Sequence, residues 1–404
     1  MSKCLISEAD CETFLSFGKM PIANGFLAPE QFDSEYFFEL KVGFSPESKM
    51  VQLTELVDRE RMFHENYAFF SSTSKRMAQH FEAFARSVRE QYFGSDPFVV
   101  EIGSNDGIMM RNFAQAGIRH LGIEPSANVA AVAREKGINT VSKFFDEALA
   151  REIVKEYGQA DAFLGANVMC HIPYMHSVMA GIKLLLKPKG VLAFEDPYLG
   201  DIIEKTSYDQ IYDEHAFYFS VQSVDYLVAK HGLEIIDVIP QSTHGGSMRY
   251  VISHQGAYPV SAAVHAQRRK EAALGLEKID TYRAFAGRVA ESRENLVSAL
   301  RDLKRQGKRV AAYGATSKST TVTNYCGIGP DLVDFISDTT PIKQGKFSPG
   351  THIPVKPYAT FKEAYPDVAL LFAWNHAEEI LANEKEFQAQ GGKWLVYVPK
   401  VKIL

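Results

Sequence analysis

The sequence has few cysteines, no long apolar run and no large excess of charge of either sign. Its four cysteines (Cys4, Cys11, Cys170 and Cys326) are too few and too scattered to form a disulfide framework. No run of eighteen or more apolar residues occurs, and the first residues lack the pattern of a signal peptide. The net charge of −5 over 404 residues gives no reason to expect a nucleic acid or a membrane surface as a partner. We therefore expect a cytoplasmic protein.

The composition that remains is that of a globular protein with sizeable cores. Hydrophobic residues make up 46% of the 404 positions, and this length is typical of two or three domains. Strand-like and helix-like segments alternate, which predicts an α/β fold. We expect a small N-terminal domain over residues 1–60, a Rossmann-like domain with a lead-in helix over 61–256, and a helical linker with a second, smaller Rossmann-like unit over 257–404.

The segment FVVEIGSNDG at 98–107 organises the second of these domains. An unbroken apolar run is followed by a short loop with Gly103 and Gly107 and then by a helical pattern, which predicts a strand, a turn and a helix. Glycine allows a backbone to approach a ligand closely, and the first turn of a helix presents N–H groups that lack partners within the helix. This pattern predicts a ligand site at the turn.

The acidic side chains in and after this turn indicate which ligand it suits. Glu101 and Asp106 would repel a pyrophosphate but suit a cationic or neutral adenosine ligand. A second strand ends before Glu124, where an acid accepts both hydroxyls of a ribose. The pattern resembles the S-adenosylmethionine (SAM) site of Rossmann-like methyltransferases, with NAD or no ligand as alternatives; Phe144 and Phe145 either stack on adenine or fill the core. The expected cofactor-binding residues are Glu101, Gly103, Asn105, Asp106, Gly107, Glu124, Pro125, Phe145 and Asn167.

Two further segments carry side chains suited to chemistry. The apolar run ADAFLGA is followed by Asn167, Cys170 and His171, and ligands bind beyond the carboxyl ends of parallel strands. The segment YDQIYDEHAFYFS at 208–220 crowds tyrosines, acids and a histidine between a predicted strand and a predicted helix. Loops at the ligand edge carry chemistry, so we favour a functional site over a solvated polar loop. His215 is the expected general base, because imidazole titrates near pH ~6.5 and a carboxylate precedes it in the sequence.

A second strand–turn–helix pattern occurs near the C-terminus. The segment RVAAYGATSKSTTVTNY combines an apolar run, Gly314 and a small polar loop, but this loop has no acids and contains Lys318. It therefore suits a phosphate better than SAM, since a helix N-terminus favours anions. Lys343, in a later glycine-containing loop, and His244, in the loop of a predicted hairpin, complete the expected substrate-binding set.

Sequence motifs occur along nearly the whole chain. They are FLSFGKMPIANGF at 14–26, SSTS at 71–74, EIGSNDG at 101–107, NVMCHIPY at 167–174, YDEHAFYFS at 212–220, HGGSMRY at 244–250 and KQGKFSPGTHIPV at 343–355. With these motifs the chain resembles the sugar C-methyltransferases of antibiotic deoxysugar pathways. The resemblance implies a three-domain enzyme that uses SAM to methylate a ring carbon of a nucleotide-linked 4-keto sugar, dTDP- or GDP-linked, as a monomer or a homodimer.

The resemblance also implies roles for individual residues. A ring carbon can attack the methyl group only after it loses a proton, and a neighbouring ketone makes this feasible by forming an enolate. By similarity, His215 removes the C3 proton, and Glu214 orients His215 or holds a sugar substituent. Tyr212 and His171 would hydrogen-bond the sugar or the developing oxyanion. A tyrosine of the family corresponds either to Tyr67 or to the Phe69 position, so Tyr67 is a further expected contact.

The chain departs from the family pattern in its first domain. Members of the family hold zinc with two C-x₂-C pairs, as structural zinc sites commonly do. Here Cys4 remains, while Ser7, Ser45 and Ser48 stand where the other thiols would fall. We therefore expect no zinc and no other metal, and Cys11 stays without a role.

Other functions remain open at this stage. One is an NAD-dependent oxidoreductase or epimerase of sugar nucleotides, although Glu101 and Asp106 argue against NAD. A second is a non-catalytic protein that binds sugar nucleotides. A third is an O- or N-methyltransferase, because the same base could deprotonate a hydroxyl group.

Overall fold

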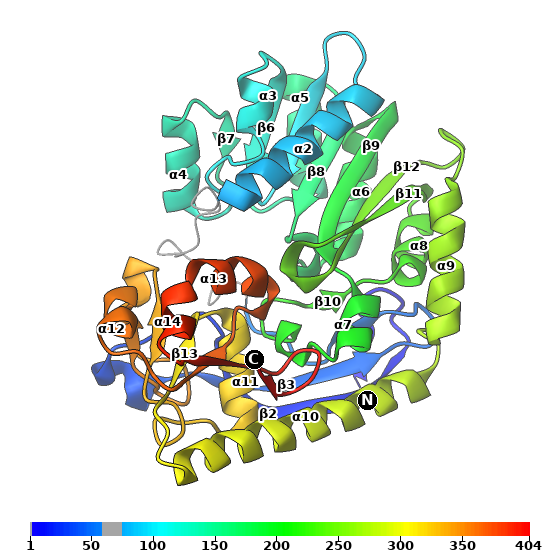
Figure 1. Cartoon of the computed structure of the whole chain (residues 1–404). Helices are drawn as coiled ribbons and strands as arrows, with labels where there is room; N and C mark the ends of the chain where they lie inside the picture. The colour runs from blue at the N-terminus through cyan, green and yellow to red at the C-terminus, as the bar shows by residue number, and fades with distance from the viewer. Residues whose placement is uncertain (1, 59–74) are drawn as a thin grey trace.

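The computed structural model describes residues 2–58 and 75–404, which form three β-sheets with helices packed around them (Figure 1). The predicted α/β class is confirmed, with two Rossmann-like units and a small N-terminal domain. Within these residues, no helix is both long enough and apolar enough to cross a membrane.

The N-terminal sheet contains strands from two distant parts of the chain. Its order is β1 (Ser2–Lys3), β2 (Asp10–Pro21), β3 (Phe37–Phe44), β4 (Val51–Leu53) and β10 (Phe217–Tyr218), and the short helix η1 (Pro29–Ser34) lies between β2 and β3. Strand β10 pairs antiparallel with β4, with Tyr218 opposite Val51. The strand that follows His215 is thus part of the N-terminal sheet, although sequence position assigned it to the second domain.

The second domain has a sheet of seven strands in the order β11-β12-β9-β8-β5-β6-β7. The parallel strands are β5 (Phe98–Ile102), β6 (Arg119–Ile123), β7 (Thr140–Val141), β8 (Ala160–Ala166) and β9 (Leu186–Pro197). The predicted closing hairpin is confirmed as the antiparallel strands β11 (Leu233–Gln241) and β12 (Ser247–His254). Every residue of β5 is buried, as expected for a parallel strand covered on both faces.

Helices cover both faces of this sheet. One face packs against α2 (Lys75–Tyr92), α3 (Arg111–Ala114) and α4 (Ala127–Glu135), and the other packs against α5 (Glu147–Tyr157), α6 (Met175–Leu185) and α8 (Val221–Ala229). Shorter helices interrupt the connections at the ligand edge. They are η3 (Met169–His171), α7 (Leu199–Lys205), η4 (Tyr208–Gln210) and η5 (Thr243–Gly245).

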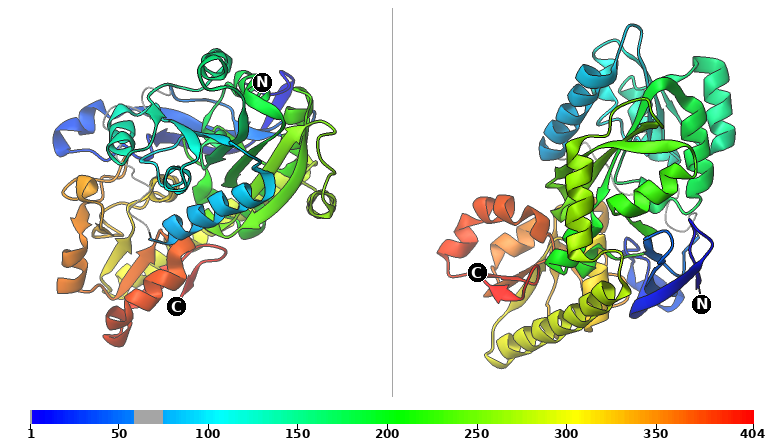
Figure 2. Two further views of the ribbon diagram at one scale, coloured as in Figure 1. Left: turned by 90° about the horizontal axis from the view of Figure 1, so that it is seen from above. Right: turned by 90° about the vertical axis from the view of Figure 1, so that its right-hand side faces the viewer.

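The C-terminal part begins with two helices, α9 (Ala262–Leu274) and α10 (Ile279–Arg305). Helix α10 packs against β2 of the N-terminal sheet as well as against its own domain, so it bridges the two (Figure 2). The C-terminal sheet has the order β15-β14-β13-β16-β17-β18. Its strands are β13 (Val310–Tyr313), β14 (Ile336–Asp338), β15 (Val355–Pro357), β16 (Val368–Leu371), β17 (Lys393–Val396) and the antiparallel β18 (Lys402–Ile403).

The remaining helices belong to this C-terminal unit. They are α11 (Ser317–Cys326), η6 (Pro341–Lys343), α12 (Tyr358–Glu363), η7 (Trp374–His376), α13 (Ala377–Asn383) and α14 (Lys385–Ala389). Helix α11 starts at Thr316, whose side chain accepts a hydrogen bond from the backbone N–H of Ser319. Such an N-cap satisfies one of the N–H groups that the first turn leaves unpaired.

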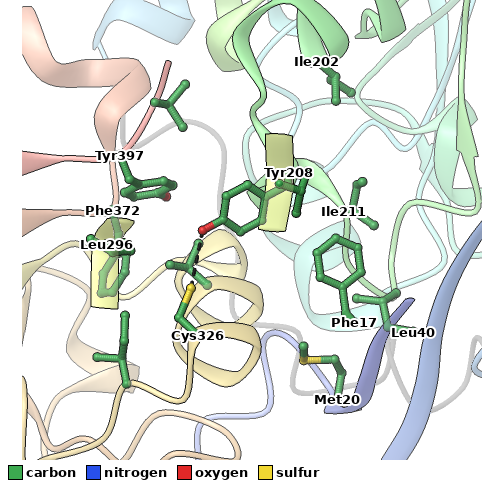
Figure 3. Packing of buried hydrophobic residues seen from close by; sticks show 14 of the residues in the cluster. Phe17, Met20, Leu40, Ile202, Tyr208, Ile211, Leu296, Cys326, Phe372 and Tyr397 are labelled. Atoms are coloured by element: carbon green, nitrogen blue, oxygen red, sulfur yellow. Dashed lines mark hydrogen bonds between the residues drawn. The ribbon is translucent and has the colours of Figure 1, made fainter. Parts of the chain in front are cut away.

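One hydrophobic core joins all three domains around Tyr208. The Tyr208 ring is fully buried between Phe17 of the N-terminal sheet and Tyr397 of the C-terminal unit (Figure 3). Its hydroxyl lies 3.5 Å from Cys326 Sγ. The sequence suggested that the tyrosines of this segment face a ligand, but Tyr208 is a core residue because it sits where three domains meet.

Replacing Tyr208 by alanine should lower the free energy of unfolding by about 3–5 kcal/mol, the usual cost of truncating a large buried aromatic side chain. Urea-induced unfolding of the whole chain measures this change. Tyr208→Phe removes only the hydroxyl group and Phe37→Ala truncates a side chain that is 43% exposed, so each should cost no more than about 1 kcal/mol. An equally small loss for Tyr208→Ala would contradict the shared core.

Candidate active site

A cavity of about 440 Å³ lies between the second and the C-terminal domains. Segments that follow β5, β6 and β8 line one side, and segments that follow β13 and β16 line the other. Residues on the first side include Gly103, Asn105, Glu124, Pro125, Asn167 and Val168, and residues on the second include Thr316, Ser317, Lys318, Ala373, Asn375 and His376.

The topology explains why the cavity forms here. In the seven-stranded sheet the strand order reverses between β5 and β8, and in the C-terminal sheet it reverses between β13 and β16. Open α/β sheets bind ligands in the crevice outside the carboxyl ends of the strands at such a reversal. The two sheets turn these edges toward one cavity, which therefore has two binding ends.

The turn after β5 forms the wall at the end of the second domain. Gly103 has φ +62°, and a Cβ at this position would lie 2.6 Å from Val168 Cγ2, so only glycine fits. Glu124 accepts hydrogen bonds from the backbone N–H groups of Asn105 (3.0 Å) and Ser126 (2.9 Å). These bonds hold the carboxylate at the cavity wall, and burial raises the pKa of Glu124.

Three of the expected cofactor-binding residues lie away from the cavity wall. Glu101 is buried inside the sheet, where burial raises its pKa well above its usual range. Asp106 forms an ion pair with Lys136 (2.9 Å), and Gly107 packs closely against Ile138. These three residues lie on the side of the turn that faces away from the cavity. Gly103 and Asn105 of the same turn line the cavity instead, which the spacing in the sequence did not indicate.

Phe145 and Asn167 both line the cavity, as expected. Phe145 is only 2% exposed and packs 4.8 Å from the Phe163 ring, so it belongs to the core and also reaches the cavity wall. Asn167 has φ +55°, and its backbone N–H donates to Glu195 O. The expected contact at Tyr67 lies outside the described residues.

The segment 208–215 supplies polar side chains between the two ends. Tyr212, Glu214 and His171 line the cavity. His215 is 1% exposed and lies directly behind them, with its ring centroid 4.2 Å from that of Tyr212 and 5.1 Å from that of His171. The structure thus brings His171, Tyr212, Glu214 and His215 together, with His215 one layer behind the cavity wall.

Hydrogen bonding fixes which nitrogen of His215 can act as a base. Nδ1 lies 2.9 Å from Gln210 O, and a carbonyl oxygen only accepts, so Nδ1 carries the hydrogen. Nε2 then has the lone pair, and among the described residues it has no hydrogen-bond partner. Burial lowers the pKa of His215 well below its usual range and that of His171 to about 4, so both rings are neutral at neutral pH.

The end of the cavity at the C-terminal domain is cationic. Lys318, in the first turn of α11, is buried, and its Nζ lies 3.4 Å from Asn375 Oδ1. Lys343 Nζ donates to Ala315 O at 2.8 Å. Burial lowers the pKa of both lysines. His244 also lines this end, with a pKa lowered to about 3 by burial.

One cluster beside the cavity has the residue types of a metal site. Side-chain ligand atoms of Cys170, His171 and His215 lie within 4.8 Å of one another. A metal would require the Cys170 thiolate, but burial, and then the neighbouring Asp196, raises the pKa of this thiol well above its usual range. The cluster therefore does not favour a metal.

The sequence analysis missed several residues of the cavity wall. Asn24 comes from the N-terminal domain, Arg76 from α2, and Asn375 and His376 from the segment after β16. Asn375 and His376 follow an apolar strand, so the rule used for Asn167 would have found them. Asn24 lies within the motif at 14–26, but nothing in that motif indicates that its side chain reaches the cavity, and no such motif contains Arg76.

Family models match three parts of the chain. A model for a zinc binding domain covers residues 4–63, a methyltransferase domain model covers 70–238 and a C-methyltransferase C-terminal domain model covers 242–399. The fold and these matches define a SAM-dependent methyltransferase. C-methyltransferase NovU from Streptomyces niveus is 34% identical over 393 residues, which make up 96% of this chain and 93% of NovU. The chain belongs to the C-methyltransferase family, so the family predicted from the motifs is confirmed and the NAD-dependent alternative is set aside.

Solved structures with similar parts include two methyltransferases. A SAM-dependent methyltransferase from Anabaena variabilis is 16% identical with a TM-score of 0.35, covering 43% of this chain and 84% of its own. Magnesium protoporphyrin IX methyltransferase from Synechocystis, solved with bound SAM, is 16% identical with a TM-score of 0.33, covering 49% of this chain and 89% of its own.

Both buried imidazoles should be neutral at about pH 6, because burial lowers their pKa and a group is deprotonated when the pH exceeds its pKa. Nitrogen NMR shifts of the histidines in ¹⁵N-labelled protein measure the charge. The exposed His265 serves as a control for the signal of a histidine in contact with solvent. His171→Gln and His215→Gln variants assign the signals, and protonated signals for either ring at about pH 6 would contradict the geometry.

Proposed function

We propose that this C-methyltransferase transfers the methyl group of SAM to C3 of a nucleotide-linked 4-keto deoxysugar, dTDP- or GDP-linked. The observation that carries the proposal is the single cavity shared by the ligand edges of two Rossmann-like sheets, with a pair of imidazoles between them. A substrate that carries both a sugar and a nucleoside diphosphate needs a site of this extended form. The relationship to a C-methyltransferase supports carbon as the acceptor.

The end of the cavity at the second domain suits SAM. Gly103 lets the ligand approach the backbone, and Asn105, Pro125 and Asn167 would surround the adenosine. The carboxylate of Glu124 would accept the ribose hydroxyls, since its oxygens retain acceptor capacity beyond the two backbone N–H groups. When bound, SAM supplies an electrophilic methyl group.

The cationic end suits a diphosphate. The first turn of α11 lines this end of the cavity, and anions are favoured at the N-terminus of a helix. Lys318 and Lys343 add two cations whose burial disfavours their charge. A bound diphosphate would favour the protonated form of both lysines, and the protonated lysines would in turn stabilise the bound diphosphate. His244 would contact the same group.

The residues between the two ends can generate a nucleophilic carbon. The C3 proton would pass to Nε2 of His215, while the electron pair of the C–H bond moves toward the ketone oxygen. The Tyr212 hydroxyl and the neutral His171 ring would donate hydrogen bonds to the developing oxyanion. His215 lies behind these two rings, so the proposal requires the sugar carbon to reach Nε2 between them.

Glu214 had two possible roles, and the contacts favour one of them. The Nδ1 hydrogen of His215 is directed at Gln210 O and not at Glu214. Glu214 instead accepts a hydrogen bond from Asn24 and lines the cavity. Holding a sugar substituent is therefore the role that we assign to Glu214.

The test is to incubate the enzyme with SAM and a panel of dTDP- and GDP-linked 4-keto-6-deoxy sugars. Mass spectrometry should show a product heavier by one methyl group. His215→Gln should lower the rate by about 10²–10⁴-fold, the usual contribution of a general base. Without SAM, deuterium from the solvent should exchange into C3 with the unchanged enzyme but not with His215→Gln.

Matched histidine variants separate the possible bases. His171→Gln should slow methyl transfer but still allow deuterium exchange at C3, because His171 stabilises the oxyanion and His215 removes the proton. The exposed His265→Gln variant should behave like the unchanged enzyme. Exchange that is lost only in His171→Gln would reverse the two roles, and the absence of methylated product from every sugar in the panel would reject the proposed substrate class.

A further inference from the structure

The N-terminal domain reaches the active site through two consecutive residues. The backbone N–H of Ala23 donates to Asp213 Oδ1 at 2.9 Å, and Asn24 Nδ2 donates to Glu214 Oε1 at 2.5 Å. Asn24 also lines the cavity. Two adjacent acids of the second domain are thus held by two adjacent residues from another domain.

The two hydrogen bonds affect the charge of Asp213 and Glu214, because both carboxyl groups are buried. Asp213 is 2% exposed and Glu214 is 5% exposed. Burial, and then repulsion from Glu214, raises the pKa of Asp213 to about 8, while burial raises the pKa of Glu214. The hydrogen bond from Asn24 and the charge of Lys343 act in the opposite direction and favour ionised Glu214. The side chain that faces the sugar therefore depends on residues of both flanking domains.

We propose that Asn24 is a positioning residue that fixes the direction and the charge of Glu214, and that it determines through Glu214 how the sugar is held. This inference rests on the proposed function. Asn24 contacts Glu214, which lies between the two ends of the cavity and is not part of the turn after β5. Its loss should therefore change the use of the sugar nucleotide and leave the binding of SAM unchanged.

A double-mutant cycle of Asn24→Ala and Glu214→Ala tests the inference. In the unchanged background, Asn24→Ala should lower kcat/KM for the sugar nucleotide by about tenfold, because a hydrogen bond to a charged group is lost. In the Glu214→Ala background the same change should cost less than about twofold, because Asn24 has nothing left to position. The SAM dissociation constant, measured by calorimetry, should stay within about twofold throughout.

One further variant tests the effect of Asn24 on the charge of Glu214, and a second serves as a control. Asn24→Asp replaces the donor by a like charge, which should raise the pKa of Glu214 and shift the acidic limb of the pH profile of kcat/KM to higher pH. Asp33→Ala, at an exposed position of the same domain, should change nothing. Equal losses for Asn24→Ala in both backgrounds, or a matching loss of SAM affinity, would overturn the inference.

Failure of the proposed function can be recognised separately. If the unchanged enzyme methylates no sugar in the panel, the proposed substrate class is rejected. The coupling between Asn24 and Glu214 can still be measured, because urea unfolding of the four proteins in the cycle requires no turnover. Asn24→Ala should then lower the unfolding midpoint in the unchanged background and much less in Glu214→Ala. Equal shifts would overturn the role of Asn24.

An independent observation concerns the zinc binding domain that the family model predicts. The four positions with zinc-ligand spacing do converge: Cys4 Sγ lies 3.2 Å from Ser48 Oγ, and Ser7 Oγ lies 3.2 Å from Ser45 Oγ. Backbone N–H groups support the cluster, with Ile6 donating to Cys4 Sγ at 3.4 Å. We call Cys4, Ser7, Ser45 and Ser48 the serine knuckle.

The residues of the serine knuckle do not fit zinc. Structural zinc sites use four ligands drawn from thiolates, imidazoles and carboxylates, and three of the four positions here are neutral hydroxyl groups. The knuckle is instead tied to the second domain. Ile6 O accepts a hydrogen bond from His176 Nε2 of α6 at 2.9 Å, and His176 Nδ1 lies 2.9 Å from His231 Nε2. The backbone at Ile6 is therefore hydrogen-bonded both to Cys4 within the N-terminal domain and to His176 of the second domain.

We infer that in this chain hydrogen bonds among the serine knuckle replace the structural metal of the family, and that the domain folds without zinc. Elemental analysis of the purified chain should show well below one zinc per chain. Chelation by EDTA should leave the thermal midpoint unchanged. The triple variant Ser7→Cys, Ser45→Cys and Ser48→Cys should gain one tightly bound zinc, because the positions already converge.

Cobalt absorption gives a readout that does not depend on activity. The triple variant should show the bands of tetrahedral thiolate-bound cobalt, and adding Cys4→Ala to it should weaken them. If the triple variant fails to fold, cobalt titration of the unchanged chain still tests the inference. The inference predicts that the unchanged chain shows no absorption bands of thiolate-bound cobalt. About one zinc per unchanged chain, lost in Cys4→Ala, would overturn the inference.

Discussion

The segment 208–215 is buried at the meeting point of all three domains, and the rest of the structure depends on its being held there. Asp209 accepts hydrogen bonds from Trp374 Nε1 (2.6 Å) and Tyr397 OH (2.7 Å) of the C-terminal domain. Asp213 accepts one from the N-terminal domain, and the following strand β10 joins the N-terminal sheet. Because buried carboxyl groups are costly without donors, this segment reaches its place only in the assembled chain.

The same burial sets the protonation states in the active site. It lowers the pKa of His171 and His215, so both imidazoles stay neutral, and it lowers the pKa of Lys318, which the charge of Asp209 opposes. The bond from Nδ1 of His215 to a backbone carbonyl directs the lone pair of Nε2 away from that carbonyl. The proton transfer that we propose for His215 therefore relies on burial and on a main-chain contact, without an acidic partner for the histidine.

The N-terminal domain contacts the second domain at several places. Side chains of the serine knuckle lie within hydrogen-bond distance of one another, and Ile6, between two of its residues, accepts a hydrogen bond from His176 of α6. The same domain supplies Asn24 to the cavity and pairs β4 with β10. Through these contacts the N-terminal domain contributes to the wall of the candidate active site.

Periodicity and turn chemistry, which act over a few residues, were enough to predict the local elements. These elements are the strand and glycine turn before Glu124, the helix that carries Lys318, and the closing hairpin. The sequence by itself also determined the family, because the motifs are specific. Only the tertiary structure decided that Asp106 lies behind the turn, that Tyr208 is a core residue and that Asn24 enters the cavity. Spacing along the chain specifies which face of a helix or strand a side chain occupies. How deeply that side chain is buried depends on how the domains pack together.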